Sequence, residues 1–132
     1  MRPWRQLAGR RQARTGVARW NRHLGLHACL GRKNLEGCAV ELKKTDGRRL
    51  PLEDQTIDLA LTVTVLQHNV DPAGLRRVIA ELCRVSAGRI VIMEDTGDMI
   101  SAPKGSSWIM RPVGVYEAEF ERHGFHLRVR LT

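Results

Sequence analysis

The stretch "IDLALTVTVLQHNVDPAGLRRVIAELCRVSAGRIVIMED", residues 57–95, holds the signals that decide the fold. It opens with a near-continuous apolar run, Ile57–Val63, which is typical of a strand covered on both faces. Asp71 and Pro72 then predict the start of a helix, with Asp as the N-cap and Pro at the first helical position. A second apolar run, residues 89–95, predicts another buried strand. This order indicates parallel strands with helices packed on their sheet.

The helix between the two runs is amphipathic. Its apolar side chains recur at positions i, i+3, i+4 and i+7, namely Leu75, Val78, Ile79 and Leu82. This spacing predicts a single apolar stripe that faces the sheet. Gly88 follows the expected end of the helix.

Two flanking segments extend the pattern. Residues 38–45, "CAVELKKT", predict a short strand that ends at the Asp46-Gly47 turn. After a loop rich in Gly, Ser and Pro, a second helix is expected to carry Tyr116 and Phe120. That helix should stop at Gly124, a C′ glycine.

The last residues, 125–132, alternate between apolar and polar side chains and predict a half-exposed strand. From residue 38 the expected order is therefore strand, strand, helix, strand, helix, strand. Such alternation indicates an α/β fold with a mainly parallel sheet flanked by helices. Residues 32–132 are expected to form this domain.

Charge is distributed unevenly along the chain. Residues 1–35 hold nine of the 22 Lys and Arg residues and no acid, whereas the other 97 residues hold 13 basic and 14 acidic side chains. The net charge of +8 therefore belongs to the N-terminus, and the rest is near neutral. Residues 1–31 show no sustained periodicity, so we expect a basic, poorly ordered or non-native segment there.

Two sharper interpretations of the basic segment compete with disorder. His23, His27 and Cys29 offer metal ligands, but no fourth ligand stands at a suitable spacing, so no metal site is expected. The Arg residues with Trp4 and Trp20 suit RNA binding through phosphate contacts and stacking. The composition favours a disordered arm without a specific partner.

The three cysteines are an odd number without a Cys-x-x-Cys pair, which argues against a disulfide framework. Such usage fits a reducing cytoplasm. No apolar run approaches the roughly 18 residues of a membrane span, and the N-terminus lacks the apolar core of a signal peptide.

Polar side chains stand at the ends of the expected strands. Thr45-Asp46-Gly47 ends the first, Thr62-Val63-Thr64 ends the second with Gln67 and His68 beyond it, and Glu94-Asp95-Thr96 ends the third. Ligands bind outside the carboxyl ends of strands in open parallel sheets, so these residues are site candidates. Each has a plainer interpretation, since an Asp-Gly pair is usually a turn and a single His is usually solvated.

Residues 46–95 resemble the middle of a class I S-adenosylmethionine-dependent methyltransferase of the type 11 kind. That family has an Asp after its third strand, a Leu-Pro turn, an Asp opening its fourth strand, a Leu-x-His segment and a helix ending before a glycine. The matching residues are Asp46, Leu50-Pro51-Leu52, Ile57-Asp58, Leu66-Gln67-His68 and Glu81-Leu82-Cys83-Arg84-Val85 before Ala87-Gly88. The tail "YEAEFERHGFHLRVR", residues 116–130, is similar to the family's later helix and sixth strand. The resemblance, over about residues 33–132, implies a partial Rossmann-like methyltransferase sheet.

The resemblance also implies S-adenosylmethionine as the cofactor. The family's acid after the third strand accepts a hydrogen bond from the adenine amino group, a role that falls to Asp46 with Gly47 beside it. The end of the fourth strand approaches the methionine part of the cofactor, which implicates Thr62 and Val63.

The acceptor side is implied less closely. Leu66 and Gln67 border the space between cofactor and acceptor, and His68 is the nearby candidate for a general base. The family's acceptor pocket is often shaped by the later loop, where Ser106, Ser107, Trp108 and Met110 stand. A surface loop is an equal interpretation of these four, and the expected acceptor is a small molecule.

The chain departs from the family where the cofactor should be gripped. None of its 12 glycines stands two residues from another, so the family's Gly-x-Gly-x-Gly loop is missing. Glycine is needed there because backbone must approach the ligand closely. Residues 1–31 are expected to match nothing in that region, and no acid for the ribose precedes Glu36. A non-native reading of the gene is one hypothesis for residues 1–31, and sequencing upstream tests it.

Two other classes of function therefore stay open. The chain is a non-catalytic remnant or a partner-dependent subunit that uses an exposed sheet edge, through self-association or another protein. Alternatively, it is a nucleic-acid-binding module that acts through its basic N-terminus.

Overall fold

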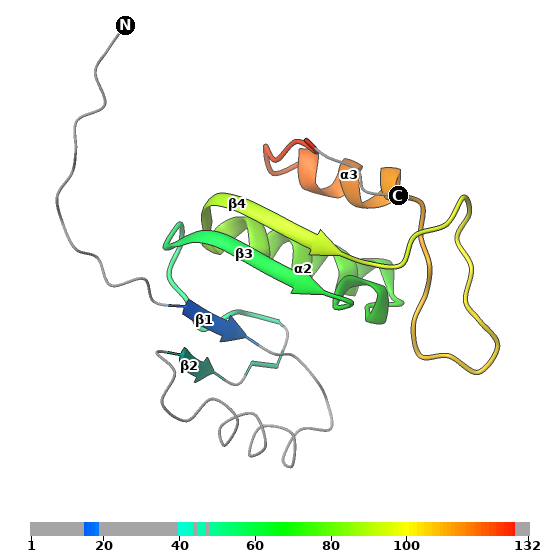
Figure 1. Ribbon diagram of the computed structural model, residues 1–132, viewed down its shortest axis with the longest axis horizontal. Coiled ribbons are helices and arrows are strands. Elements are labelled where there is room, and N and C mark those ends of the chain that lie inside the picture. The colour runs from blue at the N-terminus through cyan, green and yellow to red at the C-terminus, as the bar shows by residue number, and fades with distance from the viewer. Residues whose placement is uncertain (1–14, 19–39, 44, 47, 129–132) are drawn as a thin grey trace, which may run out of the picture. The chain divides into compact units, whose positions relative to one another are not determined.

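The chain divides into two compact units, Met1–Lys44 and Thr45–Thr132, in a computed structural model (Figure 1). The structure describes residues 15–18, 40–43, 45–46 and 48–128. Several residues singled out by the sequence lie outside the described ones, namely Trp4, Trp20, His23, His27, Cys29 and Gly47. The domain boundary expected near residue 32 lies there too, so it stays a prediction.

The first unit contains two short parallel strands, β1 (Thr15–Ala18) and β2 (Val40–Lys43). β2 confirms the strand expected within residues 38–45, with narrower bounds. β1 lies in the segment for which the sequence indicated no strand. It was missed because four residues are too few to show a strand period.

The second unit is built around a strand, a helix and a strand. β3 (Ile57–Val63) leads through a 3-10 turn, η1 (Leu66–His68), into helix α2 (Pro72–Val85). β4 (Ser86–Met93) follows directly and runs parallel to β3 (Figure 1). This confirms the predicted parallel pair with its crossover helix, and with it a partial Rossmann-like α/β fold.

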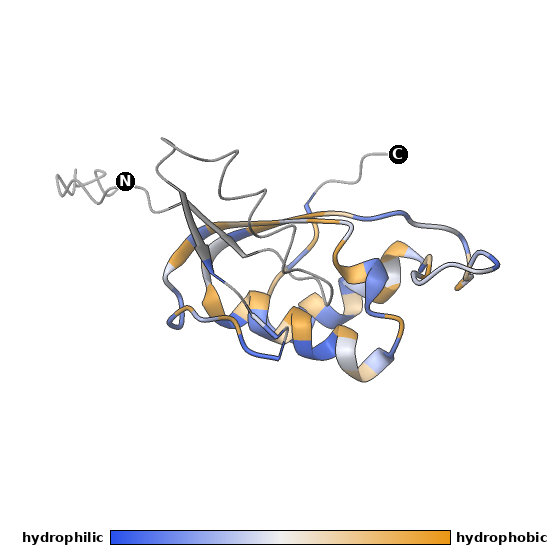
Figure 2. Cartoon of the chain, turned by 90° about the horizontal axis from the view of Figure 1, so that it is seen from below, coloured by the Kyte–Doolittle hydropathy of each residue, from blue (hydrophilic) through white to orange (hydrophobic). Residues whose placement is uncertain are grey.

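Helix α2 begins and packs as its sequence predicts. The carboxylate of Asp71 accepts a hydrogen bond of 2.8 Å from the backbone N–H of Gly74, and Pro72 occupies the first turn. The apolar stripe faces inward, where Ile79 is fully buried. In Figure 2 the helix shows alternating hydrophobic and hydrophilic bands, as an amphipathic helix does.

Helix α3 (Val113–Glu121) completes the core of this unit. Tyr116 and Phe120, one helical turn apart, are buried in the same hydrophobic cluster as the stripe of α2. The turn that ends the helix contains Gly124 at φ +81°, a conformation that favours Gly. Among the described residues, no helix is long and apolar enough to span a membrane.

Two boundaries differ from the sequence prediction. β4 starts at Ser86, because the chain leaves α2 in an extended conformation at once, so Gly88 lies inside the strand. Residues 125–128 form no strand, and the prediction of one there was wrong. Alternation shows which side chains would share a face, but not whether the segment pairs with another strand. Residues 129–132 lie outside the described ones.

The sheet of β3 and β4 has one covered face. Ala60, Ile90 and Ile92 pack against the hydrophobic core on the side of α2. The other face exposes five apolar side chains, namely Leu59, Leu61, Val63, Val91 and Met93. The prediction that both strands are covered on both faces was wrong for the described residues. A single crossover helix covers only one face of the sheet.

Gly88 lets the two strands approach each other at a register shift between Ile57 and Leu59. A Cβ atom at this position would overlap the carbonyl oxygen of Asp58, which belongs to the backbone and does not move aside alone. We expect Gly88→Ala to lower the free energy of unfolding by about 1–3 kcal/mol, the usual cost of overpacking. Urea unfolding of both proteins measures this difference.

Gly114 in α3 provides the matched control. A Cβ atom there meets no atom within 4 Å. Ala is favoured over Gly inside a helix by roughly 0.5–1 kcal/mol, so Gly114→Ala should raise stability slightly. Equal losses in both variants would contradict the role assigned to Gly88.

Candidate functional site at the carboxyl ends of β3 and β4

The carboxyl ends of β3 and β4 lie side by side. Val63 is opposite Met93 in the register, and the N–H of Thr64 donates to the carbonyl oxygen of Met93 at 2.7 Å. The segments that follow, residues 64–68 and 94–96, therefore meet at one edge, as expected for parallel strands.

The turn η1 carries three predicted site residues, and the structure separates them. Leu66 is fully buried and belongs to the hydrophobic core. Gln67 is also buried, and its Oε1 accepts a hydrogen bond of 2.8 Å from the backbone N–H of Asp95. His68 is exposed. The side chains of Leu66 and Gln67 therefore shape the turn, while His68 faces solvent.

Glu94 binds the N-terminal side of this turn. Its Oε1 accepts hydrogen bonds from the N–H groups of Val65 and Leu66 at 3.1 and 3.0 Å. Its Oε2 accepts one from the N–H of Gln67 at 3.0 Å. The first N–H groups of a helical turn have no partner within the turn, so the carboxylate satisfies them. The sequence placed Glu94 at a strand end, but nothing in it indicated this role.

Arg111 binds the other side of the turn. Its guanidinium is buried and donates to the carbonyl oxygens of Leu66, Asn69 and Val70. The N–H of Ile109 adds a hydrogen bond of 2.9 Å to the carbonyl oxygen of Gln67. Sequence reasoning missed Arg111, because a single Arg in a polar loop shows no sign of burial.

Two threonines mark the end of β3, with the exposed Val63 between them. The hydroxyl of Thr62 is buried and has no hydrogen-bond partner among the described residues. Thr64 has φ +53°, which is unusual for a β-branched residue and indicates strain. A strained backbone conformation persists only where the surrounding structure maintains it. Residues in such conformations cluster at functional sites.

Asp46 lies in a separate polar turn of the same unit. Its exposed carboxylate accepts a hydrogen bond of 2.9 Å from the N–H of Arg48, two residues on. This hydrogen bond lowers the pKa of Asp46, so the group is ionised at neutral pH. Asp46 therefore forms a turn, as the plainer interpretation predicted. Its charged carboxylate remains at the surface.

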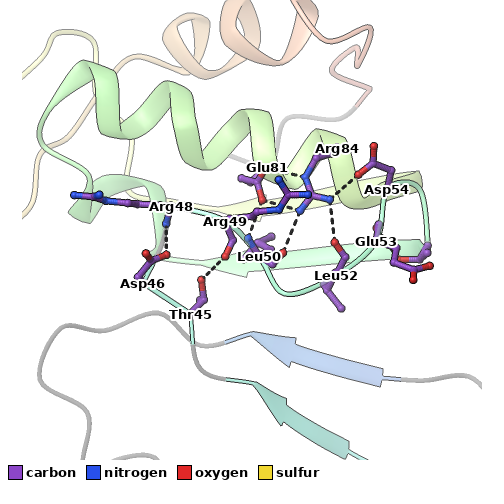
Figure 3. Close-up of polar contacts among 11 residues, drawn as sticks. Thr45, Asp46, Arg48, Arg49, Leu50, Leu52, Glu53, Asp54, Glu81 and Arg84 are labelled. Atoms are coloured by element: carbon purple, nitrogen blue, oxygen red, sulfur yellow. Dashed lines mark hydrogen bonds and ion pairs between the residues drawn. The ribbon is translucent and has the colours of Figure 1, made fainter.

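Arg84 holds the segment of residues 45–54 against helix α2 (Figure 3). Its guanidinium lies 2.8 Å from the carboxylate of Glu81 and 2.7 Å from that of Asp54. It also donates to the carbonyl oxygens of Leu50 and Leu52 at 3.1 and 2.9 Å. The hydrogen bond from Arg84 lowers the pKa of Glu81. Figure 3 shows the turn at Asp46 at the opposite end of this segment from Asp54.

The loop between β4 and α3 contains the residues expected near the acceptor. The hydroxyl of Ser106 lies 2.6 Å from the carbonyl oxygen of Pro103 and 3.0 Å from that of Trp108. Ser107 is exposed, and Met110 is half-buried in a bridge with Ser101. These contacts close the loop on itself and assign no chemical role to its residues.

A family model described as a methyltransferase domain matches residues 6–92. The chain belongs to this methyltransferase domain family. The resemblance carried by residues 46–95 is thereby confirmed. The match also includes residues 6–31, so the expectation that the N-terminal segment has no counterpart in the family was wrong there. That expectation rested on the missing glycine loop and the missing acid for the ribose.

Two known proteins are similar to this member of the methyltransferase domain family. An uncharacterized 37.1 kDa protein in transposon TN4556 of Streptomyces fradiae is 45% identical over 65 residues, which are 48% of this chain and 18% of that protein. The crystal structure of the YcgJ protein from Bacillus subtilis has a TM-score of 0.62 at 15% identity, over 82% of this chain and 50% of that chain. The chain thus spans half or less of the proteins that it matches, and the structural likeness concerns the fold.

Proposed function

We propose that the chain forms the cofactor-binding part of an S-adenosylmethionine-dependent methyltransferase that acts on a small molecule. The observation that carries this proposal is the shared edge where β3 and β4 end. There the strained Thr64 precedes the turn η1, which Glu94 and Asp95 contact through Gln67, and His68 is exposed at the end of that turn. Parallel sheets bind ligands at such an edge, and membership in the family supplies the reaction class.

The described residues fit the adenine side of this cofactor best. The ionised carboxylate of Asp46 is able to accept a hydrogen bond from the adenine amino group. Gly47 beside it is proposed to allow close approach of the backbone. Val63 offers exposed apolar surface at the strand end, whereas the side chain of Thr62 is buried and leaves only its backbone for contact.

The acceptor side depends on the turn η1. The side chains of Leu66 and Gln67 are buried, so these two residues are proposed to border the acceptor space through their backbone. The bound cofactor supplies a sulfonium methyl group that an acceptor nucleophile takes in line. The exposed imidazole of His68 is proposed to take a proton from an acceptor that must lose one. Positioning by the strand ends contributes the rest of the catalysis.

Isothermal titration of the full chain with S-adenosylhomocysteine tests this proposal. A hydrogen bond to a charged group contributes about 1.5–3 kcal/mol, so Asp46→Ala should weaken binding by roughly 10- to 100-fold. Glu53→Ala removes an exposed acid of the same segment and should leave binding unchanged. Absence of binding heat in the unaltered chain, or equal affinity in all three proteins, would overturn the proposal.

The exposed face of β3 and β4 favours a second candidate, a subunit that acts only within an assembly. Leu61 is opposite Val91 and Val63 is opposite Met93, so exposed apolar side chains adjoin across both strands. Contiguous apolar patches of this kind mark protein interaction sites. Self-association through this face is the form of the second candidate that we propose.

Light scattering on the full chain distinguishes this second candidate. We expect a dimer or larger species that Leu61→Lys returns to a monomer, because a charge in the patch opposes burial. Ile100→Lys changes an exposed apolar residue of the loop instead and should leave the assembly intact. A monomeric unaltered chain would exclude self-association without affecting the enzymatic proposal.

A reducing, cytoplasmic location forms part of the proposal. Cys83 is a free, buried cysteine, and burial raises the pKa of its thiol to about 11. The thiol therefore stays protonated and unreactive at neutral pH. Cys29 and Cys38 lie outside the described residues.

A further inference from the structure

The backbone of residues 65–70, which we name the rim turn, is satisfied mainly by side chains from distant segments. Three consecutive N–H groups of the rim turn donate to the carboxylate of Glu94. Three of its carbonyl oxygens accept from the guanidinium of Arg111. Within the turn, the side chain of Asn69 donates a hydrogen bond from Nδ2 to the carbonyl oxygen of Val65 at 2.9 Å.

The two charged groups match the polarity of the rim turn. The negative carboxylate of Glu94 faces N–H groups, and the positive guanidinium of Arg111 faces carbonyl oxygens. A hydrogen bond with one charged partner is stronger than a neutral one of similar geometry. Arg111 is only 3% exposed, so its hydrogen bonds compete little with water. Both ends of the turn are therefore held by strong contacts.

Arg111 also connects the rim turn to the loop before α3. It forms an isolated parallel bridge with Thr96, just after β4. The N–H of Ile109, two residues earlier, binds the carbonyl oxygen of Gln67. Movement of the turn would therefore break contacts in both the strand end and this loop.

We propose that Glu94 and Arg111 are positioning residues that pre-form the rim turn before any ligand binds. They hold the backbone from which His68 projects, beside the strained end of β3. A turn that is already ordered loses little conformational entropy when a ligand arrives, which favours binding. The consequence for the cofactor rests on the proposed function, whereas the ordering of the turn does not.

Amide hydrogen exchange on the ligand-free full chain tests the ordering. Glu94→Gln removes the charge and replaces one of the two acceptor oxygens with an amide nitrogen, which cannot accept from an N–H group. We expect exchange at Val65, Leu66 and Gln67 to accelerate by at least about tenfold, with little change in α2. Arg111→Lys keeps the charge but loses the planar fork, and should also accelerate exchange at the rim turn.

Ile79→Val is the control, because it weakens the core that Leu66 shares but leaves the contacts of Glu94 and Arg111 with the rim turn in place. It should accelerate exchange throughout the second unit, including α2, rather than at the rim turn alone. Unchanged exchange in Glu94→Gln, or acceleration equal to that in α2, would overturn the positioning role.

Titration with S-adenosylhomocysteine separates this inference from the proposed function. If the unaltered chain binds, Glu94→Gln should weaken binding by about tenfold. Ile79→Val should weaken it less, when both variants are measured at a temperature at which they are folded. Equal affinity in Glu94→Gln and the unaltered chain would overturn the link to the cofactor. If the unaltered chain does not bind, the proposed function fails, and the exchange experiment alone decides the ordering.

Discussion

Replacing Arg84 with Met should lower the free energy of unfolding by about 2–4 kcal/mol. Met preserves the apolar stem but leaves the carboxylate of Glu81, whose side chain is 15% exposed, without its cationic partner. Two backbone carbonyl oxygens, of Leu50 and Leu52, lose a donor as well. Domains of this size have stabilities of about 5–15 kcal/mol, so the expected loss is a large share. Urea unfolding followed by circular dichroism measures it.

Arg76→Met is the matched control for this prediction. Arg76 forms an ion pair of 3.2 Å with Glu119, but its side chain is 59% exposed. Exposed pairs contribute at most about 1 kcal/mol, so this variant should lose much less stability. Similar losses in both variants would show that Arg84 does not hold the segment of residues 45–54 against α2.

The same network predicts a dependence on pH. The hydrogen bond from Arg84 lowers the pKa of Glu81 below its usual value near ~4.3. The unfolded chain then binds the proton more readily, so this contribution is present above about pH 5 and is lost as the pH falls below ~4. Arg84→Met removes the cause of the shift. The stability difference between the two proteins should therefore shrink on acidification, and a constant difference would contradict this account.

Sequence reasoning succeeded where local signals are strong and independent of distant residues. The cap at Asp71, the proline at 72 and the apolar stripe define α2 within one segment, and the structure matches them. The apolar runs likewise located β3 and β4. The open face of the sheet was not predictable in this way, because a strand's sequence shows that it is apolar but not which elements cover it.

The contacts of the candidate site required knowledge of three-dimensional structure. Glu94 and Arg111 reach the turn at residues 65–70 across more than 25 positions of chain, so no local spacing indicates their roles. The burial of the Leu66 side chain escaped the sequence for a related reason. Its place in a family motif suggested a border of the cofactor space, whereas its side chain lies in the core.

Leu66→Ala should therefore lower the free energy of unfolding by about 2–5 kcal/mol, the usual cost of truncating a fully buried Leu. The lost methyl groups leave a cavity in the cluster that includes Ile79 and Tyr116. Leu66→Met conserves volume and should cost less than about 1.5 kcal/mol. Thermal unfolding of the three proteins measures the order of stability.

Val63→Ala is the control that distinguishes a buried core residue from an exposed residue of the proposed site. Val63 is 49% exposed at the end of β3, so its truncation should change stability by less than about 1 kcal/mol. If Leu66 instead served mainly as a ligand contact, Leu66→Ala would resemble Val63→Ala in stability and differ only in cofactor binding. A large loss of stability in Leu66→Ala, with retention in Val63→Ala, shows that the core itself supports the turn. The rim that faces solvent would then consist of His68 and the end of β3, and mutations aimed at the methionine side of the cofactor belong there.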